Sequence, residues 1–191
     1  MKVYFGFTYA DILTSAADYN KIRETILDGD HEITRDWLES AIHNAENNIK
    51  EKSRADMFKG IVSSIRAADV CIFDVTVRAM SIGQQISYAL SIGKPTLVIL
   101  NLEKGISFKE QFIGGNKSGY LELQEYTSPQ EIERYVKRFL RNNANDPKVR
   151  LNLSIERSLV ELLEKYCYEN NINKTSVVRE SLKSFLSQID K

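Results

Sequence analysis

The sequence predicts an α/β protein: a doubly wound domain with a mainly parallel five-stranded sheet, followed by a small strand-helix-helix module. Apolar, β-branched runs alternate with amphipathic helical segments through residues 1–141, which is typical of a doubly wound sheet. Residues 142–147, Asn-Asn-Ala-Asn-Asp-Pro, have the composition of a linker. Residues 148–191 then show one alternating run and two helical patterns. We therefore expect two domains, 1–141 and 148–191.

Five short runs of the first domain predict strands, because they are rich in β-branched, aromatic or other apolar residues. Two of them are continuously apolar, as strands buried on both faces of a parallel sheet should be. The predicted strands are Lys2–Phe7, His31–Thr34, Asp69–Thr76, Thr96–Leu100 and Tyr120–Leu123.

Helical segments lie between these strands. Residues Asp11–Ala17 are expected to form a polar connection, after which Tyr19, Ile22 and Ile26 recur at helical spacing and Gly29 ends the helix. The segment Trp37–Lys52 is rich in charge and predicts a largely solvated helix. The other predicted helices are Asp56–Ala68, Ile82–Ile92 and Glu131–Arg141.

Composition excludes several functional classes. Among the 191 residues, 26 Lys and Arg balance 26 Asp and Glu, so any contact with DNA must come from a local patch. Cys71, Cys167, His31 and His43 lack metal-ligand spacing, and we expect reduced thiols, no metal and no cofactor. No apolar run reaches the roughly 18 residues of a membrane span and no signal-peptide cleavage pattern follows the N-terminus, so a cytoplasmic protein without membrane contact is expected.

The segment 67–100 carries several small motifs at characteristic places. An Ala-Asp-Val strand start is followed by a strand-end acid with Val-Thr, a helix-start glycine, Tyr-Ala-Leu, and Gly-Lys-Pro before the next strand. Together they resemble the nucleoside 2-deoxyribosyltransferase superfamily, especially its 2'-deoxynucleoside 5'-monophosphate N-glycosidase branch, over about residues 2–140. The resemblance implies a Rossmann/flavodoxin-type fold with a nucleotide site at the carboxyl ends of the strands.

The two catalytic carboxylates of that family are missing from this sequence. The family's nucleophilic glutamate follows the helix-start glycine by two positions, where this chain has Gln85 after Gly83. An amide cannot replace that carboxylate. The family's second carboxylate lies eight residues before Asp69, which here is Ile61. Asp56 lies five residues earlier, about 140° around a helix, and should face elsewhere.

The phosphate-binding side also departs from the family. Where the family has Ser-x-Arg after the first strand, this chain has Phe7-Thr8-Tyr9, and Ala79 replaces a serine in the next loop. The polar and backbone groups left at the strand ends are candidate ligand contacts, because a helix N-terminus can hold an anion. The candidate ligand-binding residues are Phe7, Thr8, Tyr9, Asp74, Ser81, Gly83 and Gln85.

Residues 148–191 predict a module that needs a partner. In Lys148–Ile155 apolar residues alternate with Arg150, Asn152 and Ser154, the pattern of a strand with one apolar face. Two amphipathic helices follow, the second expected to begin at Thr175 as N-cap. Forty-odd residues of this kind cannot bury enough surface alone, so pairing of the strand with a second copy is expected.

This pattern resembles the ribbon-helix-helix family of DNA-binding domains over about residues 148–188. The resemblance implies that Arg150, Asn152 and Ser154 read base edges in the major groove. It also implies that Lys174, Thr175 and Ser176 anchor phosphate at the second helix N-terminus. Eight basic residues oppose six acidic ones in the module, so the phosphate contribution of one dimer should be weak.

Together these observations favour a homodimeric or tetrameric DNA-binding protein, a transcriptional regulator with a catalytically inactive first domain. That domain either senses a nucleotide or holds subunits together. Two alternatives stay open. One is a nucleoside or nucleotide N-glycosidase or 2-deoxyribosyltransferase with altered active-site residues. The other is a non-catalytic oligomerisation scaffold, in which the ribbon only dimerises the chain or recruits a partner protein.

Overall fold

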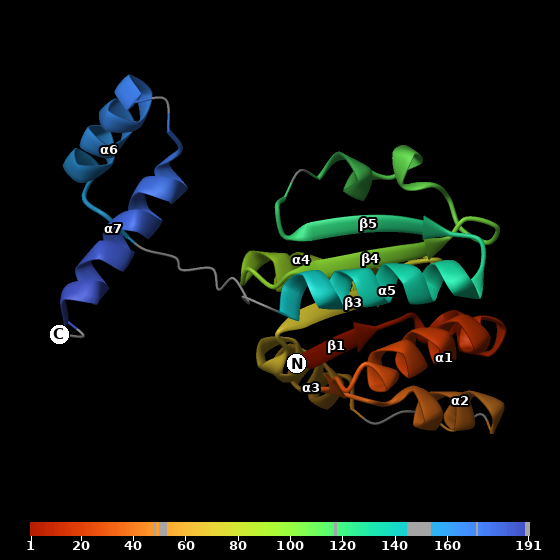
Figure 1. The fold of residues 1–191 in the computed structure, drawn as a ribbon. Helices are drawn as coiled ribbons and strands as arrows, with labels where there is room; N and C mark the ends of the chain where they lie inside the picture. Colours follow the sequence, from red (N-terminus) through yellow and green to blue (C-terminus); the bar gives the residue numbers. More distant parts are fainter. Residues whose placement is uncertain (48, 50–52, 117, 145–153, 171, 190–191) are drawn as a thin grey trace. The chain divides into compact units, whose positions relative to one another are not determined.

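Five parallel strands form the centre of the first of two units, Met1–Arg150 and Leu151–Lys191. The computed structural model describes the chain except residues 48, 50–52, 117, 145–153, 171 and 190–191 (Figure 1). The strands are β1 (Lys2–Gly6), β2 (Glu32–Ile33), β3 (Val70–Asp74), β4 (Thr96–Asn101) and β5 (Leu121–Tyr126). Their order is β2-β1-β3-β4-β5 and every pairing is parallel. The predicted doubly wound α/β fold is confirmed. The order in which strands are added to the sheet reverses between β1 and β3.

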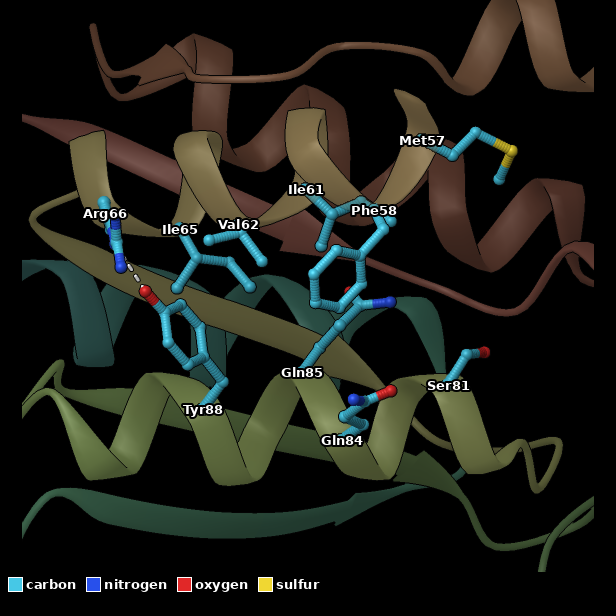
Figure 2. Close-up of a pocket in the computed structure, with 10 residues that line it drawn as sticks. All are labelled: Met57, Phe58, Ile61, Val62, Ile65, Arg66, Ser81, Gln84, Gln85 and Tyr88. Carbon is cyan, nitrogen blue, oxygen red and sulfur yellow. Dashed lines mark hydrogen bonds between the residues drawn. The ribbon is translucent and has the colours of Figure 1, made fainter. Parts of the chain in front are cut away.

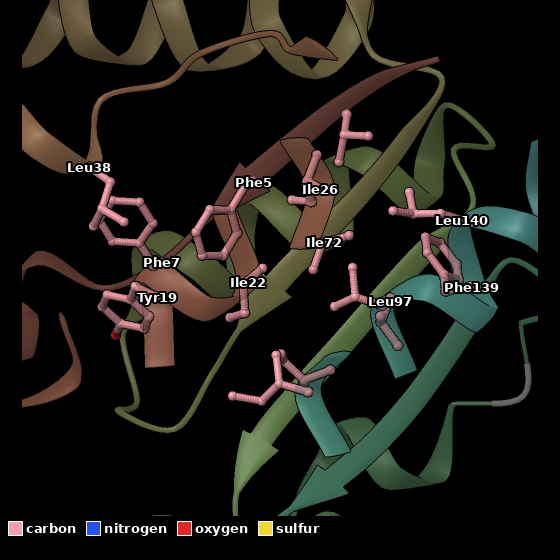
Figure 3. Close-up of a cluster of buried hydrophobic side chains, with 14 of the residues drawn as sticks. Phe5, Phe7, Tyr19, Ile22, Ile26, Leu38, Ile72, Leu97, Phe139 and Leu140 are labelled. Atoms are coloured by element: carbon pink, nitrogen blue, oxygen red, sulfur yellow. The ribbon is translucent and has the colours of Figure 1, made fainter. Parts of the chain in front are cut away.

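Helices cover both faces of this sheet (Figure 1). One face packs against α1 (Ile12–Asp28), α2 (Leu38–Glu46) and α5 (Pro129–Ala144), and the other against α3 (Arg54–Ala67) and α4 (Met80–Ser91). Alternation along the strands decides which side chain joins which core. Phe5, Ile72 and Leu97 belong to the α1–α5 side (Figure 3), whereas Tyr4 and Phe73 belong to the α3–α4 side.

Short 3-10 helices complete the first unit. They are η1 (Tyr9–Asp11), η2 (Phe108–Glu110) and η3 (Phe112–Gly115). None of them was predicted from the sequence, because segments of three or four residues leave no periodic signal. Of the helices in the described residues, none has the length and apolar character needed to cross a bilayer.

Several predicted boundaries were wrong, and β5, for example, ends at Tyr126 rather than at Leu123. The expected polar connection Asp11–Ala17 is mostly the first part of α1, because Ile12 and Ser15 are buried on the same helical face as Tyr19. Within Trp37–Lys52, helix α2 ends at Glu46, and its Leu38 and Ala41 are buried rather than solvated. Helix α5 continues through Ala144, three residues into the predicted linker.

Close packing requires a glycine at the end of β1. A Cβ atom on Gly6 would lie 2.6 Å from Cδ1 of Phe73 on the neighbouring strand. Gly93, in the turn before β4, has a φ of 74°, a conformation that favours glycine. Both glycines thus help to set the approach of strands on which the candidate site depends.

The second unit contains α6 (Arg157–Asn170) and α7 (Lys174–Ile189). Both helices were predicted, although α7 begins one residue before the expected N-cap Thr175. Asn173 caps it instead, accepting a hydrogen bond of 2.8 Å from the backbone N–H of Ser176. Of the predicted strand Lys148–Ile155, residues 148–153 lie outside the described residues, and Ser154 and Ile155 have no regular structure. The ribbon stays a prediction.

Candidate functional site

An open groove of about 570 Å³ runs between α3 and α4 (Figure 2). Apart from Arg66, its α3 wall is hydrocarbon, and its α4 wall is mainly polar. Figure 2 shows Phe58, Ile61 and Ile65 of α3 facing Gln85 and Tyr88 of α4 across this space. The lining residues are Met57, Phe58, Ile61, Val62, Ile65, Arg66, Ser81, Gln84, Gln85 and Tyr88. A volume of this size is in the range that holds a small molecule.

Gln85 is held from below by the sheet. The hydroxyl of Tyr4, a β1 residue that is 2% exposed, donates a hydrogen bond of 2.8 Å to Oε1 of Gln85. Burial raises the pKa of Tyr4 above its ordinary value, against the opposing effect of the Arg35 charge. The hydroxyl therefore stays protonated and remains a donor, which fixes the amide of Gln85 with its oxygen inward.

The two positions that the resemblance assigns to catalytic carboxylates lie in this same groove. Gln85 and Ile61 both line it, from α4 and α3 respectively. Asp56 is exposed and is not a lining residue, in agreement with its expected orientation. Among the residues that line the groove there is thus no carboxylate.

A single cation marks one end of the groove. Nε of Arg66, in the last turn of α3, donates a hydrogen bond of 2.5 Å to the hydroxyl of Tyr88. The guanidinium also lies over the Tyr88 ring, 5.9 Å from its centroid. The ammonium of Lys94 donates hydrogen bonds to the backbone oxygens of Arg66 and Ala68, and so satisfies two carbonyl groups at the C-terminal end of α3. Arg66 is thereby positioned without an acidic partner among the described ion pairs.

The predicted ligand residues after β1 lie outside this groove. Phe7 is 4% exposed and stacks on Trp37, with ring centroids 4.6 Å apart. Thr8 is also buried, and its hydroxyl donates to the backbone oxygen of Val77 at 3.1 Å, which ties β1 to the loop after β3. Tyr9 is half-buried, with its ring 6.4 Å from that of Trp37. Any ligand contact of these three residues stays a prediction.

Asp74 lies on the opposite side of the sheet from the groove. It is 1% exposed and accepts hydrogen bonds from the backbone N–H of Thr76 at 2.9 Å and from the hydroxyl of Tyr126 at 3.0 Å. Burial raises its pKa to about 6, although both hydrogen bonds oppose the rise. Asp74 therefore joins the ends of β3 and β5 inside the protein, and its ligand role is untested.

The predicted helix-start residues divide between two cavities. Ser81 lines the groove with Gln85, whereas Gly83 lines a second cavity of about 280 Å³ together with Arg78, Gln111 and Ile113. The structure thus brings together Ser81, Gln85 and Ile61 but separates them from Gly83. In the described residues, no three His, Cys, Asp or Glu side chains are grouped as a metal site requires.

The predicted DNA-binding residues are only partly described. Arg150 and Asn152 lie outside the described residues, and Ser154 is exposed. Lys174, Thr175 and Ser176 form the exposed first turn of α7. The ammonium of Lys174 pairs with Glu164 of α6 at 2.5 Å. Because that pair is about half exposed, it contributes little to stability.

Sequence reasoning missed Tyr4, Arg66 and Tyr88 as parts of the site. Tyr4 was predicted only as part of the strand Lys2–Phe7, and neither Arg66 nor Tyr88 was named as a candidate. Their positions depend on the packing of α3 beside α4 over β1, which no local pattern reports. The helical spacing of Ser81, Gln85 and Tyr88 was the only available signal.

The fold of the first unit resembles that of a nucleoside N-glycosidase. A solved structure, CMP N-glycosidase BcmB of Clostridium botulinum, is similar, with a TM-score of 0.50 and 13% sequence identity. The similarity covers 72% of this chain and 98% of the other. At this identity it shows the fold alone. No known family model matches the sequence, and no curated protein does.

Proposed function

We propose that this chain is a self-associating DNA-binding protein, a transcriptional regulator, whose first unit has lost glycosidase chemistry. Two copies would pair through the second unit, and tetramers would arise if the first unit also associates. The first unit would serve to sense a ligand or to hold subunits together. The observation that carries the proposal is the exposed apolar surface of the two C-terminal helices.

That surface is too apolar for a unit that stands alone. Among the described residues of the unit, only Cys167 is buried, and the two helices expose apolar side chains at helical spacing. These are Leu159, Leu162, Tyr166, Leu182, Phe185, Leu186 and Ile189, each between 42% and 65% exposed. A second copy of the same helices would cover them, which supports the predicted dimer.

DNA contact follows from the expected ribbon and the start of α7. A paired ribbon would present Arg150, Asn152 and Ser154 to base edges. The first turn of α7 would offer its backbone N–H groups and Lys174 to phosphate. Each of these contacts is a proposal that rests on the resemblance to ribbon-helix-helix domains.

Loss of catalysis in the first unit is supported by the groove itself. Hydrolysis of a glycosidic bond by this family's route needs a nucleophile and an acid close together. The groove offers an amide at Gln85 and hydrocarbon at Ile61 in their place. The enzyme alternative finds support only in the fold similarity to the CMP N-glycosidase, and a base-release assay tests it.

The test of DNA binding uses the full chain and double-stranded DNA from upstream of its own coding sequence. Gel shifts should show binding that weakens steeply with salt. Arg150→Ala should weaken it at least about tenfold, because a bidentate base contact contributes about 1–3 kcal/mol. The matched control is Lys183→Ala, which removes the same charge from the exposed side of α7. Equal effects of both substitutions, or no shift with any DNA, would contradict the proposal.

A further inference from the structure

The groove between α3 and α4 offers hydrogen-bond donors near its middle, at Gln85, and at one end, at Arg66, with hydrocarbon beside them (Figure 2). Oε1 of Gln85 is occupied by the Tyr4 hydroxyl, so the Nε2 amide group is left to face other partners. No hydrogen bond from that nitrogen is found in the described part of the chain. Gln85 is half-buried and lines the groove, so its N–H groups suit an acceptor atom of a bound molecule.

At the end of the groove lies the guanidinium of Arg66. The Tyr88 hydroxyl accepts the hydrogen bond from Nε of Arg66. The two terminal nitrogens of Arg66 are left to bind an anion in the forked geometry that suits a carboxylate. Arg66 is the one charged side chain among the lining residues of this groove. The local field is therefore positive, without a carboxylate in the lining to neutralise it.

The space between the two donors is short and apolar. Gln85 and Tyr88 are three residues apart on α4, about 4.5 Å of helix rise. Across from them lie Phe58, Ile61 and Ile65 of α3 (Figure 2). The lining between the two donors is hydrocarbon, which suits an aromatic ring or a short hydrocarbon chain. Burying such a body against Phe58, which is 55% exposed, removes apolar surface from water.

We propose that this groove binds a small organic monoanion with an apolar body, an aryl-alkanoic acid in chemical class. Its anionic group pairs with Arg66, and its body packs against Phe58, Ile61 and Ile65. An acceptor atom of the ligand takes a hydrogen bond from Nε2 of Gln85. The assignment rests on the sensing role proposed for the first unit, and it names the ligand class of that site.

Two other occupants fit the groove less well. A nucleoside monophosphate carries two charges and several hydroxyl groups, whereas the lining has one cation and mostly hydrocarbon. A second copy of the chain, docked through the same face, would bring another Arg66 and again no lining carboxylate, so the two faces are not complementary in charge. An apolar anion complements both the charge and the hydrocarbon.

The experiment is isothermal titration calorimetry of the full chain with three probes. We expect 3-(4-hydroxyphenyl)propanoate, whose phenol oxygen supplies the acceptor atom, to bind, its neutral amide to bind at least tenfold more weakly, and CMP to bind no better than the amide. Arg66→Gln should reduce affinity for the acid at least tenfold. Lys59→Gln, which removes an exposed charge of α3 outside the lining, should change it less than twofold.

A second variant tests the groove independently of Arg66→Gln, whose loss of binding could also come from misfolding. Ile61→Trp should fill the groove and abolish binding of the acid, while circular dichroism stays that of the unaltered chain. Equal affinity for acid and amide, no binding of the acid, tighter binding of CMP, or indifference to both substitutions would overturn the assignment. If instead Phe58→Ser splits an oligomer of the unaltered chain in sedimentation, a second copy occupies the groove and the assignment is wrong.

The same samples separate this assignment from the proposed function. If the unaltered chain shifts DNA but does not bind the acid, only the ligand assignment fails. If the chain binds the acid but no DNA, the proposed regulatory function fails and the ligand site stands.

Discussion

The hydroxyl of Tyr4 donates a 2.8 Å hydrogen bond to Oε1 of Gln85, joining the first strand of the sheet to the helix that borders the groove. Tyr4 is 2% exposed and cannot turn to water. The pair therefore fixes which end of the amide faces the groove. With a glutamate in place of Gln85, the same Tyr4 hydroxyl would donate its hydrogen bond to a carboxylate.

Removing that donor should destabilise the protein measurably. Tyr4→Phe keeps the ring and leaves Oε1 of Gln85 without its partner, so we expect the free energy of unfolding to fall by about 1–2 kcal/mol. Urea titration measures the change. Tyr168→Phe is the matched control, because Tyr168 is 90% exposed. Equal stability of the two variants would contradict the importance of this contact.

A methyl group at Gly6 should also destabilise the sheet. The new Cβ would lie 2.6 Å from the Phe73 ring, which is itself fully buried. We expect Gly6→Ala to cost about 1–3 kcal/mol in thermal or urea unfolding. Gly115→Ala is a suitable control, since a Cβ there meets no atom within 4 Å. A loss no larger than that of the control would show that the strands can separate without cost.

Asp74 should make stability depend on pH. Its pKa is raised to about 6 in the folded protein, against about 3.9 in an unfolded chain. Between these values the folded state keeps a proton that the unfolded state has lost. The contribution of Asp74 to stability is therefore fully present below pH 4 and is lost as the pH rises through 6.

The variant Asp74→Asn removes this titration. From pH 4 to pH 7, the free energy of unfolding of the unaltered chain should fall relative to that of the variant by up to about 3 kcal/mol. Urea titrations at several pH values measure the difference. Two parallel pH profiles would show that Asp74 does not titrate in this window.

Charges on the exposed apolar face of the second unit should prevent self-association. Phe185→Asp puts a carboxylate where a second copy is expected to pack, so sedimentation should show smaller species than for the unaltered chain. Tyr168→Asp adds the same charge at a more exposed position, 90% against 62%, and should leave the association intact. Unaltered chains that sediment as monomers would contradict the proposed dimer.

The fold class was accessible from the sequence because buried parallel strands such as Thr96–Asn101 are largely apolar. The start of α1 was not predicted, because Thr14 and Ser15 are polar residues and so did not indicate a helix packed on the core. In the structure Ser15 is nevertheless buried. The groove was accessible only in part. Gln85 and Ile61 were identified by resemblance, but the contacts of Tyr4 and Arg66 arise from packing between distant segments.

The central claim is that the groove of the first unit lacks the chemistry for glycosidic cleavage, because an amide and a hydrocarbon side chain occupy the two required positions. The most direct measurement incubates the full chain with CMP and with deoxynucleoside 5'-monophosphates and quantifies free base by chromatography. The account predicts no release above the uncatalysed rate from any of them. Release of base with repeated turnover, lost on substitution of Gln85 by Ala, would contradict it.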